Sequence, residues 1–421
     1  MTTTHAPGAQ APSSQAHRAQ APGTQAHGSQ DHAPRLLWLD GLRFVAAFAV
    51  VIYHFAASPT AGRYWGADPV GVFPLANQVG RYGWLSVELF FMLSGFVILM
   101  SAQGRSIPEY IGSRVGRLFP AFWAAVVATA ILQFFWDGGR NPGFRATLLN
   151  FTMVPDLFGV QPVQVVFWTL LAELKFYVLV GILLAVTSWW NRRQARKAQL
   201  RMARASSGAP GDTVPPPHLR REFPEWTVVA FAVGWPAVAL VVQQLGWTTA
   251  AEWLVAPYAP YFGIGMLLYL LRRYRQARLL IPLAITVGMG VYHLIPRAQH
   301  AHDLQEVPVS VGMSIAIMLL AVLWVWQASS AKATIDDPRV AKILVTAGAL
   351  TYPLYLIHTQ FGFLLIDVLY PQVSDWTTLG ITVLACGVLA WVIHLVAEKR
   401  FSKPLRLWVT ARLSRRWPLG G

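Results

Sequence analysis

Residues 39–55 read LDGLRFVAAFAVVIYHF, an almost continuous apolar run that carries Arg43 near one end and His54 near the other. A helix needs about 20 apolar residues to cross the hydrocarbon core of a bilayer, and the flanking residues from Leu37 to Ala57 bring the run to that length. An ionisable side chain inside such a helix is costly and usually faces the protein interior or a water-filled cavity. The run therefore predicts a transmembrane helix with a polar, functional face.

The composition extends this prediction to the whole chain. Of 421 residues, 55% are hydrophobic and only 13% are charged, and the mean hydropathy is +0.43. A soluble domain typically has about 25% charged residues. The sequence predicts an all-α polytopic membrane protein with about ten transmembrane helices, near residues 37–57, 84–102, 119–136, 163–190, 226–245, 251–271, 279–295, 307–327, 343–370 and 376–396.

The positive charges predict the direction in which these helices cross. The net charge is +15, but the 34 Lys and Arg residues lie in short clusters and form no continuous basic face for a nucleic acid. If the N-terminus is cytoplasmic, most Lys and Arg residues fall in cytoplasmic segments, so we expect both termini in the cytoplasm. The single cysteine, Cys386, excludes an intrachain disulfide and a thiolate-rich metal site, and we expect no metal.

Three segments differ from the transmembrane domain predicted for residues 35–408. Residues 1–34 contain the tandem repeat AQAPSSQAH and AQAPGTQAH, so we expect a disordered, low-complexity cytoplasmic tail. Residues 191–225 are predicted to form a basic cytoplasmic loop, whose first half can extend the preceding helix and whose second half is typical of a linker. Residues 409–421 are predicted to form a basic cytoplasmic tail.

The ionisable residues inside the apolar runs separate into two layers. His54 follows Arg43 by eleven residues, so the two side chains lie about 16 Å apart on nearly the same helix face. The predicted helix directions place Glu88 and Glu173 in outer halves, near the depth of His54. The cytoplasmic layer contains Arg43 together with Arg114 and Arg117.

These two layers suit an acyl transfer. A neutral histidine beside a carboxylate is held in one tautomer and can remove a proton from an attacking hydroxyl. Arginines at the cytoplasmic mouth suit a donor that carries phosphates, such as an acyl thioester. Other readings stay open: Arg43 can extend to the interface, His54 can be a structural hydrogen-bonding residue, and Lys175 can pair with Glu173.

Five ordered motifs between residues 36 and 407 resemble the acyltransferase-3 family of bacterial integral-membrane O-acyltransferases. The first, LDGLRFVAAFAVVIYHF, is similar to the family's first-helix motif, in which ten residues separate an Arg from a His. The others are WLSVELFFMLSGFVI, YIGSRVGRLFPAFW, VFWTLLAELKFYVL and LTYPLYLIHTQFG. This chain departs from many relatives by having Glu88 where they have Asp.

The resemblance implies transfer of an acyl group, commonly acetyl from acetyl-CoA, to a hydroxyl of a sugar. The acceptor would belong to a surface polysaccharide, a lipopolysaccharide or a glycosylated metabolite. Acyl-CoA is then a co-substrate, no tightly bound cofactor is expected, and the expected partners are acyl-CoA, a glycoconjugate and the lipid bilayer. The expected location is a bacterial cytoplasmic (inner) membrane.

The roles follow from the two layers and from this resemblance. We expect His54 to act as the base, polarised by Glu173. Donor binding is expected from Arg43, Arg114, Arg117 and His358, with support from Asp40, Glu88, Trp168, Tyr177 and Tyr355.

Two other functions remain as alternatives. A proton-coupled transporter or flippase of a glycoconjugate would use His54 and Glu173 as a proton relay. Many transporters have an internal repeat, however, and the two halves of this sequence show none. A sensory or scaffolding protein would need neither Arg43 nor His54.

Overall fold

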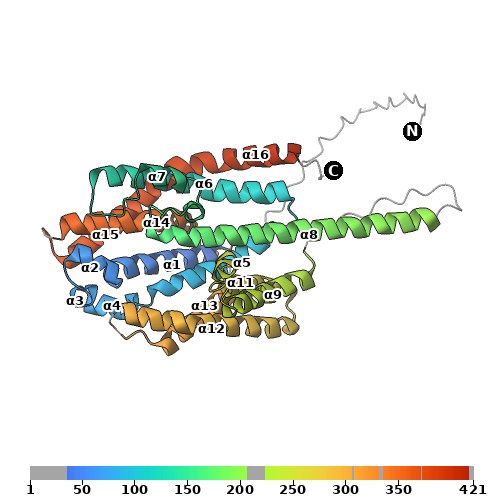
Figure 1. The fold of residues 1–421 in the computed structure, drawn as a ribbon, viewed down its shortest axis with the longest axis horizontal. Helices are drawn as coiled ribbons and strands as arrows, with labels where there is room; N and C mark the ends of the chain where they lie inside the picture. Colours follow the sequence, from blue (N-terminus) through green and yellow to red (C-terminus); the bar gives the residue numbers. More distant parts are fainter. Residues whose placement is uncertain (1–35, 206–222, 306–307, 331–334, 371, 417–421) are drawn as a thin grey trace, which may run out of the picture. The chain divides into compact units, whose positions relative to one another are not determined.

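The computed structural model describes residues 36–205, 223–305, 308–330, 335–370 and 372–416, and these residues form helices and connecting turns without a strand. Most of the long helices run roughly parallel or antiparallel to one another (Figure 1). The long helices are α1 (Leu37–Ala56), α5 (Ser86–Ala102), α6 (Ile107–Phe135), α8 (Trp168–Ala205), α9 (Glu225–Gln244), α11 (Ala259–Tyr274), α12 (Leu280–Gln305), α13 (Val311–Ala328), α14 (Pro338–Leu369), α15 (Asp375–Ile393) and α16 (Lys399–Arg416).

Short helices occupy the connections. They are α2 (Pro59–Trp65), α3 (Pro69–Val72), α4 (Pro74–Gly80), α7 (Phe144–Asn150) and α10 (Thr248–Trp253), with single 3₁₀ turns at Gly83–Leu85, Pro155–Phe158, Val165–Phe167 and Ala277–Leu279. The tail predicted for residues 1–34, the linker at 206–222 and the last residues of the chain lie outside the described residues.

Nine helices of the described residues are long and apolar enough to cross a membrane, which confirms the polytopic all-α prediction. The remaining predicted span, at residues 251–271, forms α10 and α11 instead. Helix α11 has only 16 residues, and its residues from Ala259 to Leu271 are all buried. A helix that is apolar and buried on every side belongs to the core of the bundle rather than to its lipid-facing surface.

Glycines let α11 cross α5 with the two backbones in contact. A Cβ atom at Gly95 of α5 would collide with the main-chain oxygen of Phe262, and one at Gly265 of α11 would collide with that of Met92. Small residues at such crossings allow helices to pack closely in membranes, where the hydrophobic effect between helices is weak. The core of the bundle therefore depends on these two glycines.

Gly265→Ala is expected to destabilise the protein by about 1–3 kcal/mol, because the new methyl group overpacks the crossing. Gly288→Ala is the matched control, since a Cβ atom at this position of α12 meets nothing within 4 Å. Thermal unfolding of both variants in detergent measures the effect. Equal melting temperatures for the two variants would contradict the close crossing.

Helices α1 and α14 lie side by side and run in the same direction. Gly348 of α14 lies against Asp40 near the start of α1, and Gly362 lies against the Phe55 ring near its end. The two contacts are 15 residues apart on α1 and 14 residues apart on α14, so the two helices keep their register over about four turns. Within this stretch α14 contains Pro353, which lacks an N–H group and removes one helical hydrogen bond.

Helix α8 runs in the opposite direction to α14 and starts inside the bundle. Just before it, Gln164 is fully buried and bonds to Thr359, while Thr169 Oγ1 lies 2.8 Å from the Tyr355 hydroxyl. At its other end α8 continues to Ala205, so the first half of the basic loop extends this helix.

Helices α15 and α16 are joined by a π-helical turn at His394–Glu398. Helix α16 then packs on the first part of α6, where a Cβ atom at Gly116 would collide with the backbone and side chain of Arg406. A π turn widens a helix locally and is frequent at functional sites. Here it places polar residues of the last helices beside α6.

Candidate active site

Arg43 and His54 both point into the bundle. Ala47 and Val50, which lie between them on the same face of α1, are buried, whereas Val45 on the opposite face is exposed to the lipid side. The Arg43 side chain nevertheless keeps 24% of its surface exposed, and His54 is also partly exposed. These two polar side chains therefore keep accessible surface on the face of α1 that packs in the bundle.

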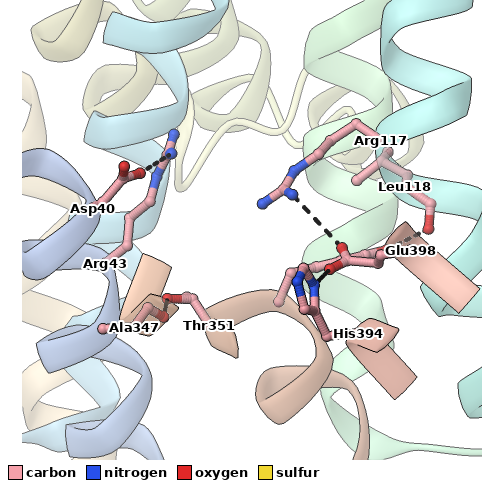
Figure 2. Close-up of polar contacts among 9 residues, drawn as sticks. Asp40, Arg43, Arg117, Leu118, Ala347, Thr351, His394 and Glu398 are labelled. Carbon is pink, nitrogen blue, oxygen red and sulfur yellow. Dashed lines mark hydrogen bonds and ion pairs between the residues drawn. The ribbon is translucent and has the colours of Figure 1, made fainter. Parts of the chain in front are cut away.

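Arg43 lies among several charged side chains. The part of the bundle around Arg43 and Arg117 is called the cationic region below. Arg43 forms an ion pair with Asp40 at 3.6 Å, and it also interacts electrostatically with Arg117, Glu173 and Tyr177. Figure 2 shows Arg43 with Asp40 on one side and Arg117 with its partners on the other. The structure thus brings Arg43 and Arg117, both assigned to the cytoplasmic layer in the sequence, into one region.

Glu173 belongs to this cationic region and not to the level of His54. Its Oε1 atom accepts hydrogen bonds from Ser94 at 2.7 Å and from Tyr177 at 2.6 Å, and Tyr110 donates to the Tyr177 carbonyl at 3.0 Å. The expected hydrogen bond to His54 is absent among the residues that the structure describes, because all polar partners of Glu173 there are these hydroxyl groups.

The cause of this difference is the deep start of α8. Gln164 lies at the level of Thr359, the neighbour of His358, and Thr169 lies at the level of Tyr355. Glu173 follows nine residues after Gln164, so it lies about 13 Å further along the helix axis. The sequence placed Glu173 near the depth of His54, whereas these contacts place it further along α8, away from the level of His358.

Arg114 lies against two tyrosine rings at the edge of the cationic region. Its guanidinium donates to Ser101 at 3.0 Å and to Ser113 at 3.1 Å, and it lies over the rings of Tyr110 and Tyr177 at 5.9 and 5.7 Å. No carboxylate neutralises it among the described residues. Its positive charge is therefore available to an anionic ligand.

Arg105 interacts electrostatically with both Arg114 and Arg406. Burial, together with the positive charges of Arg114 and Arg406, lowers the pKa of Arg105, which lies in the turn between α5 and α6. Arginines that gather despite mutual repulsion are typical of sites for phosphate. The sequence did not indicate Arg406, because it follows the last predicted span and is about 300 residues from Arg105 in the sequence.

The other end of the α1 face carries a pair of imidazole rings. The rings of His54 and His358 lie 5.2 Å apart, and His54 makes no hydrogen bond or ion pair with any described residue. His358 is fully buried, and its Nδ1 atom lies 2.9 Å from the Tyr355 carbonyl. Since a carbonyl only accepts, Nδ1 of the neutral ring carries the proton and Nε2 carries the lone pair.

The Nε2 atom of His358 is buried without a hydrogen-bond partner in the described part of the chain. Its lone pair can therefore accept a hydrogen bond from a neighbouring donor. His358 was expected to line the donor channel, and the structure places its ring beside that of His54. The two histidines together can accept, hold and return a proton.

The expected supporting residues lie in three different places. Glu88 is buried and forms an ion pair with Arg297 of α12, whose guanidinium also lies 4.4 Å from the Tyr258 ring centroid. Arg297 follows the span predicted for residues 279–295, but α12 continues to Gln305, so Arg297 lies within this helix with 23% of its side chain exposed. Tyr355 lies near His358 with a ring distance of 5.8 Å, and Trp168 packs on Tyr258 at 5.1 Å.

Several polar residues of the site were missed in the sequence. Ser94 donates a hydrogen bond to Glu173, and Tyr110 donates one to the Tyr177 carbonyl. Glu398 pairs with both Arg117 and His394. The spacing of four residues between Glu173 and Tyr177 was a readable signal for their hydrogen bond. The described residues contain no group of three His, Cys, Asp or Glu side chains that could hold a metal ion.

The chain is similar in sequence to known proteins. The profile of a family described as "Acyltransferase domain" matches residues 36–396. The acyltransferase MdmB of Streptomyces mycarofaciens is 24% identical over 391 residues, which are 86% of this chain and 91% of MdmB. The exopolysaccharide production protein ExoZ of Rhizobium meliloti is 31% identical over 134 residues, 28% of this chain and 41% of ExoZ.

A third relative is a putative acetyltransferase of the Acidianus two-tailed virus. It is 23% identical over 154 residues, which cover 36% of this chain and 41% of the viral protein. No solved structure matches the chain.

Proposed function

Because this chain belongs to the acyltransferase domain family, which matches residues 36–396, we propose that it transfers an acetyl group from acetyl-CoA to a sugar hydroxyl. The chain is an acyltransferase with multiple membrane-spanning helices. The proposed acceptor is a sugar of a surface polysaccharide, a lipopolysaccharide or a glycosylated metabolite. The names of two relatives, a putative acetyltransferase and an exopolysaccharide production protein, support this choice of acyl group and acceptor.

The proposed mechanism rests on the parallel packing of α1 and α14. Two parallel helices hold Arg43 in a cationic region at one end and the His54 and His358 pair further along the same face. An acyl-CoA molecule has phosphates at one end and a reactive thioester at the other. This donor can therefore place its phosphates among the arginines and extend its thioester toward the histidines.

His54 is proposed to act as the general base. One of its ring nitrogens removes the proton from the acceptor hydroxyl while the hydroxyl oxygen attacks the thioester carbonyl. The C–S bond then breaks, the thiolate leaves with its electron pair, and the imidazolium returns the proton to the thiolate. The Nε2 lone pair of His358 can accept a hydrogen bond from this imidazolium and so replaces Glu173 as the proposed polarising partner.

Donor binding is proposed for Arg43, Arg114 and Arg117. Glu173 then has a different task, because its charge acts on Arg43 while Ser94 and Tyr177 fix its orientation. We place the arginines on the cytoplasmic side of a bacterial inner membrane, with both termini in the cytoplasm. The distribution of Lys and Arg along the sequence supports this orientation.

The test is transfer by the purified protein in detergent or in proteoliposomes. Acetyl-CoA labelled in the acetyl group is incubated with candidate glycans, and label on a sugar hydroxyl together with free CoA is the expected result. Proton flux coupled to movement of the glycan, without consumption of the thioester, would instead support the transporter alternative.

Arg43→Lys is expected to raise the KM for acetyl-CoA about tenfold, because an ammonium cannot replace the bidentate contacts of a guanidinium. The charge of the side chain is kept, so pairing with Asp40 persists and the fold is preserved. Initial rates at varied acetyl-CoA and saturating acceptor measure the effect. An unchanged KM would argue against donor binding by Arg43.

A further inference from the structure

Glu398 and His394 form a polar pair that the mechanism above leaves without a task. The π turn brings the two side chains together, and His394 Nδ1 lies 2.7 Å from Glu398 Oε2. The side chain of Glu398 is only 5% exposed. A buried carboxylate is costly, and His394 satisfies only one of its two oxygens.

The second oxygen of Glu398 faces Arg117. The distance between Oε1 and the Arg117 guanidinium is 3.6 Å, which allows an ion pair but is too long for a good hydrogen bond. No other described residue donates a hydrogen bond to Oε1. Glu398 therefore attracts Arg117 without occupying its N–H groups.

Arg117 is fixed loosely and faces the cationic region. Its side chain is 47% exposed, and its guanidinium lies 6.0 Å from the ring centroid of Tyr352, whose hydroxyl is bonded to the Leu118 carbonyl. Figure 2 shows the Arg117 side chain extending past Glu398 toward the side on which Arg43 lies. The donating groups of Arg117 are thus directed to the same region as those of Arg43.

We propose that Glu398, oriented by His394, is a positioning residue that holds Arg117 ready for a phosphate group of the acyl donor. The carboxylate restrains the guanidinium by charge alone, at a distance that leaves its hydrogen bonds to the donor. This inference rests on the proposed function, because it assumes that Arg117 binds the donor. Glu398 does not touch the donor or the reacting atoms.

Glu398→Gln tests the proposal, since it keeps the size of the side chain and removes its charge. We expect the KM for acetyl-CoA to rise about tenfold with kcat within about twofold of the wild-type value. A purely structural role would lower kcat and thermal stability together. A lower KM would show that Glu398 only competes with the donor for Arg117 and would overturn the proposal.

A double-mutant cycle with Arg117→Ala shows whether Glu398 acts through this arginine. In the Arg117→Ala background, Glu398→Gln should leave the KM for acetyl-CoA unchanged; an undiminished second increase would contradict the proposal. His394→Ala, which frees Glu398 from its orienting partner, should raise the KM in the same way as Glu398→Gln, by a smaller factor.

Glu225→Gln is the matched control. Glu225 of α9 forms an ion pair with Arg278 at 2.9 Å, neither residue has a role in the proposed mechanism, and loss of the pair should leave the KM unchanged. The Arg117→Ala and Glu398→Gln results together show whether the donor role of Arg117 or only the positioning role of Glu398 fails. If Arg117→Ala leaves the KM of an active enzyme unchanged, the proposed donor role fails; if Arg117→Ala raises it and Glu398→Gln does not, only the positioning role fails.

Discussion

His54→Ala is expected to lower the rate of acyl transfer by about 10²–10⁴-fold, the usual contribution of a general base. The side chain makes no hydrogen bond or ion pair to any described residue, so its removal should not disturb the packing of α1. The loss should appear in kcat, because the proposed base acts in the chemical step and not in donor binding. Labelled acetyl transfer with the purified variant measures it.

His293→Ala supplies the control for this experiment. His293 is a buried histidine of α12 that takes no part in the proposed mechanism, so this variant should retain transfer. Both variants should insert into membranes; His54→Ala should unfold close to the wild-type temperature, and His293→Ala should lose some stability because its side chain is buried. Normal transfer by His54→Ala would refute the assignment of His54 as the base.

Arg297→Met is expected to destabilise the fold by about 3–5 kcal/mol, because it leaves the carboxylate of Glu88 buried without its ionic partner. The Glu88 residue is only 1% exposed, so water cannot replace the guanidinium. Thermal or denaturant unfolding in detergent measures the change. Arg278→Met, which breaks the more exposed pair with Glu225, should cost less than about 1 kcal/mol.

A second variant distinguishes the loss of the ion pair from the loss of packing. The double variant Arg297→Met with Glu88→Gln removes both charges and should recover much of the lost stability. If the double variant is as unstable as Arg297→Met alone, the stacking of Arg297 on Tyr258 is the main contribution of that side chain.

The sequence predicted the helices well because long apolar runs and inward-facing charges are local signals. The inward face of α1, with Arg43 and His54, follows from helical periodicity alone. The depth of Glu173 does not, because hydropathy cannot show that the chain before α8 re-enters the bundle with a buried Gln164. The same limit applies to Arg297, which follows the span predicted for residues 279–295 and forms an ion pair with the buried Glu88 carboxylate.

The partners across the site were harder to predict than the helices. The contact between His54 and His358 depends on the parallel packing of α1 and α14, which are more than 300 residues apart in sequence. Likewise, Glu398 reaches Arg117 from a π turn that no apolar period reveals. A single sequence contains no signal for such long-range pairs.

The proline within α14 has a consequence for where this helix can bend. Pro353 separates Tyr352, which lies under Arg117, from His358, which lies beside His54. Pro353 has no N–H group to donate to the Ala349 carbonyl, so the helix is weakest in the turn before the proline. We expect bending of α14 at this turn to leave the distance between the two histidines unchanged.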